Sequence, residues 1–293
     1  MTELENFTRN AAKRYLQNIV FVDDEIYSHG TGKPVTVTEM PVFASPFGRE
    51  GERIKPAEQK VEGLDECSGL KVPYHPRQLV QSFAREGMVC ALYEPVEGFE
   101  TNQDSELFKL CERADVVILD WDLFNEDGRN IQPLIRNLVS QSQNSVPHAA
   151  RLVVVYTARP DLKRVADLVY EYLRGHDLEA DEVNAPATLV FGATRVIVLG
   201  KPDVPGRTEE SKALEVPESQ LAERIINEFA LMHAGILPSY ALYGMASLRR
   251  NSKKILDKFH SDMDGPFLLH RAMLLEDEDE AEWLRLVAEG KSA

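Results

Sequence analysis

The chain has 293 residues, 43% of them hydrophobic, and its 33 Lys and Arg against 48 Asp and Glu give a net charge of −15. This length and apolar content are enough for one large folded domain, or a domain with an appendage, and they argue against wholesale disorder. Nonspecific binding to nucleic acid depends on clustered cations that release counterions, so the acidic balance disfavours general DNA or RNA binding.

The three cysteines, Cys67, Cys90 and Cys111, are odd in number and widely spaced, and none belongs to a CxxC pair. This pattern argues against a zinc site and fits a reducing cytoplasm. The first residues lack the apolar core of a signal peptide, and no run of about 18 apolar residues indicates a transmembrane helix. We therefore expect a cytoplasmic protein that is neither secreted nor membrane-spanning.

The first predicted elements are a helix and a strand that follow one another directly. Apolar residues at helical spacing predict an amphipathic helix from Leu4 to Gln17. The next residues, Ile19 to Val22, are an unbroken β-branched and aromatic run of the kind that is buried on both faces of a parallel sheet. The run ends abruptly at Asp23 and Asp24, so we expect these acids at the carboxyl end of a buried strand.

A long irregular segment separates this strand from the rest of the fold. Residues 26–72 are rich in Gly and Pro and keep no period, which predicts an inserted loop or small subdomain. Regular structure resumes at Pro76 with a helix closed by Gly87, and Met88 to Tyr93 then reads as a strand. The elements predicted after it are a helix near Ser105 to Cys111, a strand from Val116 to Leu119, a helix from Ile131 to Val139, a strand from Leu152 to Tyr156, a helix from Pro160 to Arg174, a strand from Val196 to Leu199 and a helix from Glu218 to His233.

This alternation predicts the fold class and the domain boundaries. Five buried strands that alternate with helices call for an α/β fold, with a doubly wound five-stranded parallel sheet, flavodoxin-like, and right-handed crossovers. We place this domain at residues 1–235, with a second insertion at about 175–194, where Leu189 to Phe191 could add an edge strand.

Residues 236–293 are predicted to form a helical C-terminal extension. Its two helices are expected from Tyr240 to Phe259 and from Phe267 to Glu289, and the acidic run Glu276 to Glu280 falls inside the second. Basic residues on the first helix could touch nucleic acid or an acidic partner, but a solvated helix face is the favoured interpretation. These basic residues are Arg249, Arg250, Lys253, Lys254 and Lys258.

Polar side chains follow four of the five predicted strands. Because the carboxyl ends of parallel strands meet at one edge of the sheet, we expect these side chains to lie together. Three crowded carboxylates repel one another, and a hard divalent cation would compensate, with Mg²⁺ the natural candidate for oxygen ligands. The residues are Asp23 and Asp24 after the first strand, Asp120 after the third, Thr157 after the fourth and Lys201 after the fifth.

This set of residue types suits phosphoryl transfer. With a cation in place, Asp120 could attack a phosphoryl donor as a nucleophile. The metal, Lys201, the Thr157 hydroxyl and backbone amides could hold the phosphoryl oxygens, since this reaction needs mainly positioning and neutralised charge. The sequence therefore predicts an aspartyl phosphate at Asp120.

Four stretches, in this order, resemble the receiver domain of two-component response regulators. VFVDDE (20–25) resembles the acidic pair that binds Mg²⁺, and VVILDWDLFNEDG (116–128) resembles the phosphoacceptor strand and its following loop. VVVYTA (153–158) resembles the strand that carries a hydroxyl, and VLGKP (198–202) resembles the Lys-Pro turn. Each motif alone is common, but their joint order is specific, and the resemblance covers roughly residues 19–234.

The resemblance implies a role for each strand-end residue. Asp120 would accept phosphate from a histidine kinase or phosphotransfer protein, in a phosphorelay that uses Mg²⁺. Asp23 and Asp24 would hold the metal together with Asp120 and the backbone of Asp122, while Thr157 and Lys201 would contact the phosphoryl group. The protein would undergo only its own phosphorylation and dephosphorylation, so it would not be an enzyme with turnover. Its output would pass through protein contacts, with a downstream effector or in a homodimer.

One position departs from the receiver pattern. Val198 stands where ordinary receivers usually place an aromatic switch residue, so the usual coupling between that residue and the hydroxyl of Thr157 is in doubt. The chain therefore resembles an atypical receiver. A degenerate receiver that serves only as an interaction module is one alternative, and for Asp23 and Asp24 it would leave nothing more than a solvated turn.

A second alternative is a phosphatase of the haloacid dehalogenase type. In that interpretation Asp120 would be the nucleophile and Asp122 the general acid, and Thr157 and Lys201 would supply the hydroxyl and the cation. That superfamily places its metal-binding acids after the lysine, whereas here the acidic pair precedes Asp120. The order of the residues favours the receiver.

Overall fold

The computed structural model describes residues 2–26, 76–144, 150–184 and 187–273. Within this part of the chain, no helix is both long enough and apolar enough to cross a membrane. Several predictions concern residues outside these ranges: nearly all of the insertion at 26–72, Cys67, and the second predicted C-terminal helix beyond Met273 with its acidic run Glu276 to Glu280.

The core of the protein is a sheet in which the five predicted strands are all parallel. Their order is β2-β1-β3-β4-β7, so the chain starts near the middle of the sheet and winds outward in both directions. This arrangement is the doubly wound topology predicted from the sequence. The strands are β1 (Asn18–Val22), β2 (Val89–Tyr93), β3 (Val116–Leu119), β4 (Arg151–Thr157) and β7 (Thr194–Gly200).

The prediction of a five-stranded sheet was wrong, because the sheet has seven strands. Two further strands, β5 (Glu182–Asn184) and β6 (Thr188–Phe191), extend it beyond β7 by antiparallel pairing. The edge strand considered at Leu189 to Phe191 is present as β6. The sequence of β5, Glu-Val-Asn, is too short and too polar to show a strand pattern, and only its pairing with β6 makes it one.

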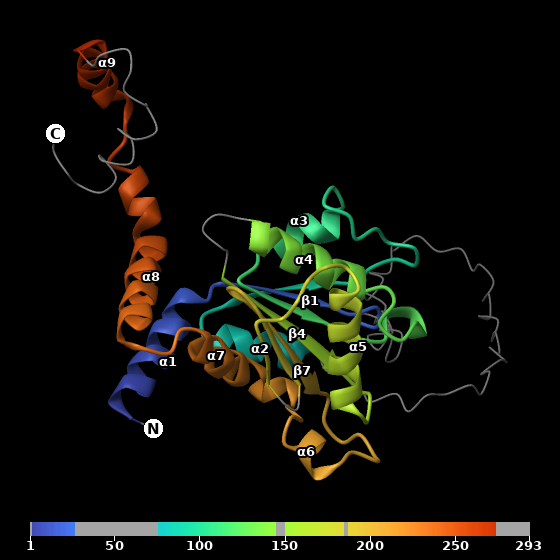
Figure 1. Cartoon of the computed structure of the whole chain (residues 1–293). Helices are drawn as coiled ribbons and strands as arrows, with labels where there is room; N and C mark the ends of the chain where they lie inside the picture. The colour runs from blue at the N-terminus through green and yellow to red at the C-terminus, as the bar shows by residue number, and fades with distance from the viewer. Residues whose placement is uncertain (1, 27–75, 145–149, 185–186, 274–293) are drawn as a thin grey trace, which may run out of the picture.

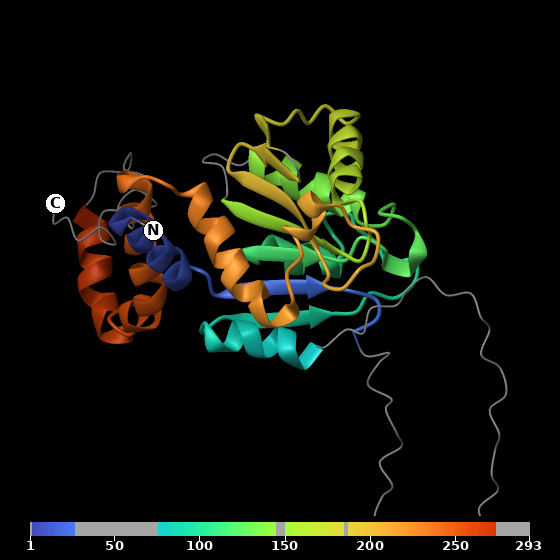
Figure 2. The same ribbon diagram turned by 90° about the horizontal axis from the view of Figure 1, so that it is seen from below.

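Helices cover both faces of the sheet (Figures 1 and 2). Side chains alternate along each strand, so Phe21 packs with one layer of helices and Val22 with the other. The first layer contains α2 (Pro76–Arg85) and α7 (Leu221–Met232), joined by the end of α1 (Glu3–Tyr15). The second layer contains α3 (Glu106–Glu112), α4 (Gln132–Asn144) and α5 (Leu162–Arg174).

The C-terminal helices leave the sheet and pack against the first helix. The helix α8 (Ile236–Leu256) lies beside α1 and extends away from the sheet, with η4 (Ser261–Met263) and α9 (Asp264–Met273) beyond it (Figure 1). A hydrogen bond of 2.6 Å joins the hydroxyls of Thr8 and Ser239 at the contact between α1 and α8.

One residue of the predicted basic face, Arg249, is only partly exposed and is bound to an acidic residue. Arg249 of α8 donates to both carboxylate oxygens of Asp115, at 2.8 and 3.1 Å, and stacks over the ring of Tyr15. For Arg249 the solvated interpretation was therefore wrong, because the contact between α8 and the sheet domain supplies its counter-charge. Arg250, Lys253, Lys254 and Lys258 are exposed.

Candidate phosphoryl-acceptor site

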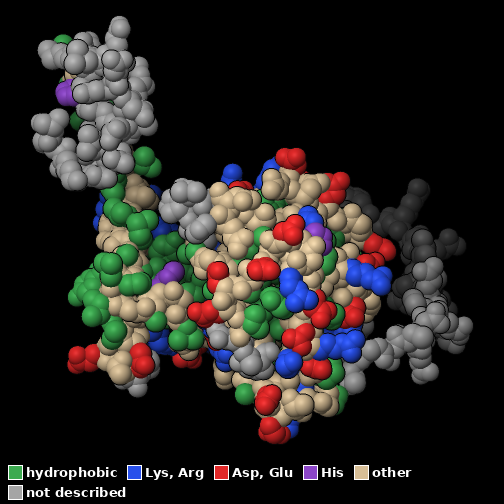
Figure 3. Space-filling model, in the orientation of Figure 1, with side chains coloured by type: hydrophobic (Ala, Val, Ile, Leu, Met, Phe, Trp, Pro, Cys, Tyr) green, Lys and Arg blue, Asp and Glu red, His purple; other side chains and the backbone are tan. Residues whose placement is uncertain are grey.

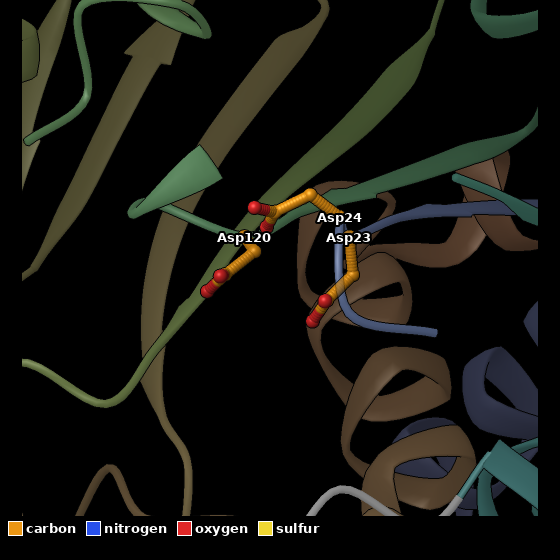
Figure 4. Close-up of side chains that lie close together, drawn as sticks. All are labelled: Asp23, Asp24 and Asp120. Atoms are coloured by element: carbon orange, nitrogen blue, oxygen red, sulfur yellow. The ribbon is translucent and has the colours of Figure 1, made fainter. Parts of the chain in front are cut away.

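Parallel pairing brings the acidic residues to one edge of the sheet. Val22 and Leu119 are partners in the register of β1 and β3, so Asp23 and Asp120 follow the ends of adjacent strands. The backbone N–H of Asp120 donates to the carbonyl of Val22 at 2.9 Å, which fixes the two strand ends together. Carboxylate oxygens of Asp23, Asp24 and Asp120 all lie within 4.8 Å of one another (Figure 4).

Burial makes this cluster electrostatically costly. Asp23 is 1% exposed and Asp120 is 8% exposed, while Asp24 is half-buried. The pKa of Asp120 is raised to about 7, mainly by burial. The attraction of Lys201 opposes this rise, and the neighbouring charge of Asp23 adds to it. Burial also raises the pKa of Asp24 above its ordinary value. A divalent cation would relieve both effects, because it would favour the ionised form of each carboxylate.

Lys201 bridges two of the three acids. Its ammonium Nζ lies 3.1 Å from Oδ2 of Asp23 and 3.2 Å from Oδ1 of Asp120, and its side chain is only 12% exposed. Burial lowers the pKa of Lys201, but the attraction of Asp120 and Asp23 outweighs burial, so the net pKa lies above the ordinary value. The site therefore contains a charged lysine between two carboxylates.

Thr157 lies at the same edge of the sheet, at the end of β4. It pairs in register with Gly200, the residue before Lys201, and its carbonyl accepts a hydrogen bond of 2.8 Å from the N–H of Lys201. The side chain is fully buried, and its Oγ1 accepts from the N–H of Arg159 at 3.1 Å. The strand-end residues predicted from the sequence therefore lie at the end of, or directly after, the neighbouring strands β1, β3, β4 and β7.

The loop after β3 is shaped around the acidic cluster. The N–H of Phe124 donates to Oδ2 of Asp24 at 2.9 Å, which orients that carboxylate. Gly128, eight positions after Asp120, has a φ of +81°, and a Cβ at this position would lie 2.3 Å from the ring of Trp121. The glycine is therefore required both by its backbone conformation and by the close approach of the Trp121 ring.

Sequence reasoning missed Arg159, which holds Asp122. Its guanidinium donates to both oxygens of Asp122, at 2.7 and 2.5 Å, and also lies 3.2 Å from Oδ1 of Asp127. Attraction to Asp122 raises the pKa of Arg159 above its ordinary value. The only available signal was the position of Arg159, two residues after Thr157. The carbonyl of Asp122, expected to face the metal, accepts from the N–H of Asn125 at 2.8 Å and keeps a second lone pair.

The residues present fit a hard divalent cation. Three carboxylates offer oxygen ligands within 4.8 Å of one another, and two of them are buried. Soft ligands are absent from this group, which suits Mg²⁺ better than a transition metal.

Comparison with known proteins identifies the family. Residues 15–206 match the family model of the response receiver domain. The chain belongs to the receiver domain family. No curated protein and no solved structure matches the chain significantly. Membership of this family supports a role in two-component signalling.

This receiver domain lacks an aromatic switch residue in β7. Val198 is buried in β7, within the core formed with α4 and α5. A short aliphatic side chain in a packed core cannot swing between a buried and an exposed position as a large ring at the surface could. β7 therefore offers no aromatic ring at position 198 to couple with Thr157.

Proposed function

We propose that this protein is a Mg²⁺-dependent phosphoacceptor of a two-component phosphorelay, with Asp120 as the residue that is phosphorylated. The observation that supports the proposal best is the cluster of three carboxylates within 4.8 Å, bridged by the Lys201 ammonium. Asp23, Asp24, Asp120 and the backbone of Asp122 would hold the metal. The bound Mg²⁺ would neutralise charge on the phosphoryl oxygens.

The proposed donor is the phosphohistidine of a histidine kinase or of a phosphotransfer protein. A carboxylate oxygen of Asp120 attacks the phosphorus, an oxygen–phosphorus bond forms and the phosphorus–nitrogen bond breaks. The imidazole nitrogen keeps the bonding electrons and takes a proton from solvent. Lys201 then loses one carboxylate partner and pairs with the phosphoryl group, and the Thr157 hydroxyl donates to another phosphoryl oxygen.

The proposal includes no turnover of an external substrate. The phosphatase alternative needs a proton on Asp122 for donation to a leaving group, but both oxygens of Asp122 accept hydrogen bonds from Arg159.

We also propose a cytoplasmic location, which fits the unpaired thiols of Cys90 and Cys111. The proposed output passes through protein contacts with a downstream effector.

The test is phosphorylation by a small phosphodonor. The protein with Mg²⁺ and acetyl phosphate should gain the mass of one phosphoryl group, in a linkage that is stable to acid and labile to base. Asp120→Asn should abolish the gain, whereas Asp177→Asn, which changes an exposed carboxylate far from the site, should retain it. Labelling that persists in Asp120→Asn would falsify the proposal. Continuous release of phosphate from a small phosphoester, lost in Asp122→Ala, would favour the phosphatase, and neither labelling nor Mg²⁺ binding would indicate an interaction module.

A further inference from the structure

The connection between β7 and α7 contains a buried cation that the proposed reaction does not use. This connection includes two short helices, α6 (Glu209–Lys212), which the sequence did not predict, and η3 (Glu218–Gln220), which forms the start of the helix predicted from Glu218 to His233. The side chain of Arg207 is fully buried and forms an ion pair of 2.9 Å with Glu215.

The guanidinium of Arg207 donates to backbone carbonyls of both loops on the phosphoryl side of the site. The acceptors are the carbonyl of Lys201 at 2.6 Å, that of Thr157 at 3.0 Å and that of Arg159 at 3.1 and 3.3 Å. Gly200 leaves room for this arrangement, because a Cβ at Gly200 would lie 2.2 Å from Nη1 of Arg207. One planar side chain thus joins the ends of β4 and β7.

Burying a charged group has a large desolvation cost, and an apolar side chain would often stabilise the same space better. Arginine is suited to this place because its five donors have a fixed planar geometry that can hold several acceptors at once. The same connection is also attached to β4 through Tyr156, whose hydroxyl donates to the carbonyl of Val216 at 2.6 Å. The contacts of Arg207 therefore indicate control of loop geometry.

We propose that Arg207 is a positioning residue for phosphoryl transfer, which holds Thr157 and Lys201 in register with each other so that the hydroxyl and the ammonium meet the phosphoryl group on Asp120. This inference rests on the proposed function. It also makes the β7–α7 connection responsive to the state of the site, since the partner of Arg207 at the other end is Glu215 in that connection. Arg207 would thereby connect the site to the β7–α7 connection without an aromatic residue at position 198.

The affinity for Mg²⁺ is the measurement that distinguishes a positioning role of Arg207 from general damage to the site. Asp23, Asp24 and Asp120 follow β1 and β3, whereas the hydrogen bonds and the ion pair of Arg207 are with the ends of β4 and β7 and with the β7–α7 connection. A positioning residue for the phosphoryl side should therefore change the rate of phosphorylation and leave the affinity for Mg²⁺ nearly unchanged.

The variants Arg207→Gln, Arg207→Lys and Gly200→Ala of the full chain should be labelled with acetyl phosphate at saturating Mg²⁺, and their Mg²⁺ dissociation constants measured by calorimetry. We expect each variant to be labelled about tenfold more slowly or slower still, because each loses one or two strong hydrogen bonds. The affinity of each variant for Mg²⁺ should stay within about twofold of the wild type. Circular dichroism checks folding. Glu215→Gln, which loosens Arg207 without removing it, tests the same link if the other variants do not fold, and should slow labelling less.

Three results would overturn the inference. Folded Arg207→Gln and Gly200→Ala labelled at the wild-type rate would show that the carbonyl contacts do not matter. Equal losses of labelling and of Mg²⁺ affinity would indicate general damage to the fold. Full recovery in Arg207→Lys would mean that charge alone suffices. If the wild type itself is not labelled, the proposed function fails. Failure of the proposed function is therefore distinguishable from failure of the role proposed for Arg207.

A separate observation concerns the outer face of α8. Ser239, Leu242 and Ala246 are buried, and Thr8 of α1 bonds to Ser239, so this side of α8 faces α1. The opposite side carries large apolar residues at helical spacing that solvent reaches, and Figure 3 shows hydrophobic side chains along this helix. These residues are Leu237 (79% exposed), Leu248 (55%) and Ile255 (39%). The ring of Tyr240 instead lies 5.0 Å from the ring of Phe7 in α1.

We infer that the outer face of α8, together with the exposed apolar residues of α9, pairs with the same surface of a second copy of the chain in a dimer. Thirteen large apolar residues are exposed between Ile236 and Leu269, over α8, η4, α9 and the turns between them, and together they present on the order of 1,000 Å². The largest apolar patch of a typical monomer is ~300–600 Å², and each partner of a standard interface buries ~800 Å².

The test is the oligomeric state of the full chain, measured by light scattering at micromolar concentrations. We expect a dimer in the wild type and a monomer in Leu248→Glu/Ile255→Glu, with unchanged circular dichroism. Val96→Glu, which changes an exposed residue on another part of the surface, should remain a dimer. A monomeric wild type would overturn the inference, and would be the result if residues 274–293 or a different protein cover this face. Persistence of the dimer in the double variant would overturn it as well.

Discussion

Arg159 and Asp122 form a two-pronged ion pair, at 2.7 and 2.5 Å, that joins the loop after β4 to the loop after β3 beside Asp120. Both loops carry residues of the proposed site, and they are far apart in sequence. The ion pair is therefore a tertiary contact that connects the acceptor loop with the residues next to Thr157.

Arg159→Ala should reduce the free energy of unfolding by about 1 kcal/mol, because a planar bidentate pair is lost, although solvent screening of this partly exposed side chain limits the effect. Lys163→Ala removes a single exposed pair with Asp167 and should cost no more than about 0.5 kcal/mol. Urea denaturation measures both. Equal effects of the two substitutions would contradict a special role for the bidentate geometry.

Asp120→Asn should stabilise the protein at pH 8 and have little effect at pH 4. The pKa of Asp120 is raised from 3.8 to about 7, so between these values the folded state holds a proton that the unfolded state has released. Stability therefore falls as pH rises through this window, and removal of the carboxylate abolishes that fall. Melting temperatures without metal should differ by roughly 3 °C or more at pH 8. A gain of the same size at pH 4 would exclude this cause, and Asp177→Asn should show no such dependence.

Mg²⁺ should raise the melting temperature of the wild type. A metal present at about 100 times its dissociation constant contributes ~2.7 kcal/mol, which corresponds to roughly 5–10 °C for a domain of this size. Asp23→Asn and Asp24→Asn should each remove most of this shift, because each removes a ligand of the cluster. Sodium chloride at equal ionic strength controls for screening. A shift that survives in both variants would place the binding elsewhere.

Gly128→Ala should be more damaging than Gly98→Ala, and the two glycines form a matched pair. Their φ angles are +81° and +79°, so the backbone cost is shared, but only at Gly128 would the new Cβ collide with Trp121. We expect a loss of about 1 kcal/mol for Gly98→Ala and about 3 kcal/mol for Gly128→Ala. Denaturant unfolding gives both values. Similar losses would mean that the ring of Trp121 moves aside without cost.

The five parallel strands were predictable because each is an unbroken run of apolar residues, and such a run can be recognised from neighbouring residues alone. The positions of Asp23, Asp120, Thr157 and Lys201 followed from the same rule, since parallel strands end at a common edge. The hairpin of β5 and β6 was only half visible. β6 has an apolar core, whereas β5 becomes a strand only through its partner.

The sequence alone determined the succession of strands and helices along the chain, the edge at which chemistry gathers and the acidic character of that edge, because these properties depend on local patterns of apolar and charged residues. Only the tertiary structure decided how arginines are used: Arg159 on Asp122, Arg207 on three carbonyls and Arg249 on Asp115. A long, charged side chain can reach partners far away in sequence and leaves no periodic signal. Its role becomes visible only when the folded chain brings those partners within hydrogen-bonding distance.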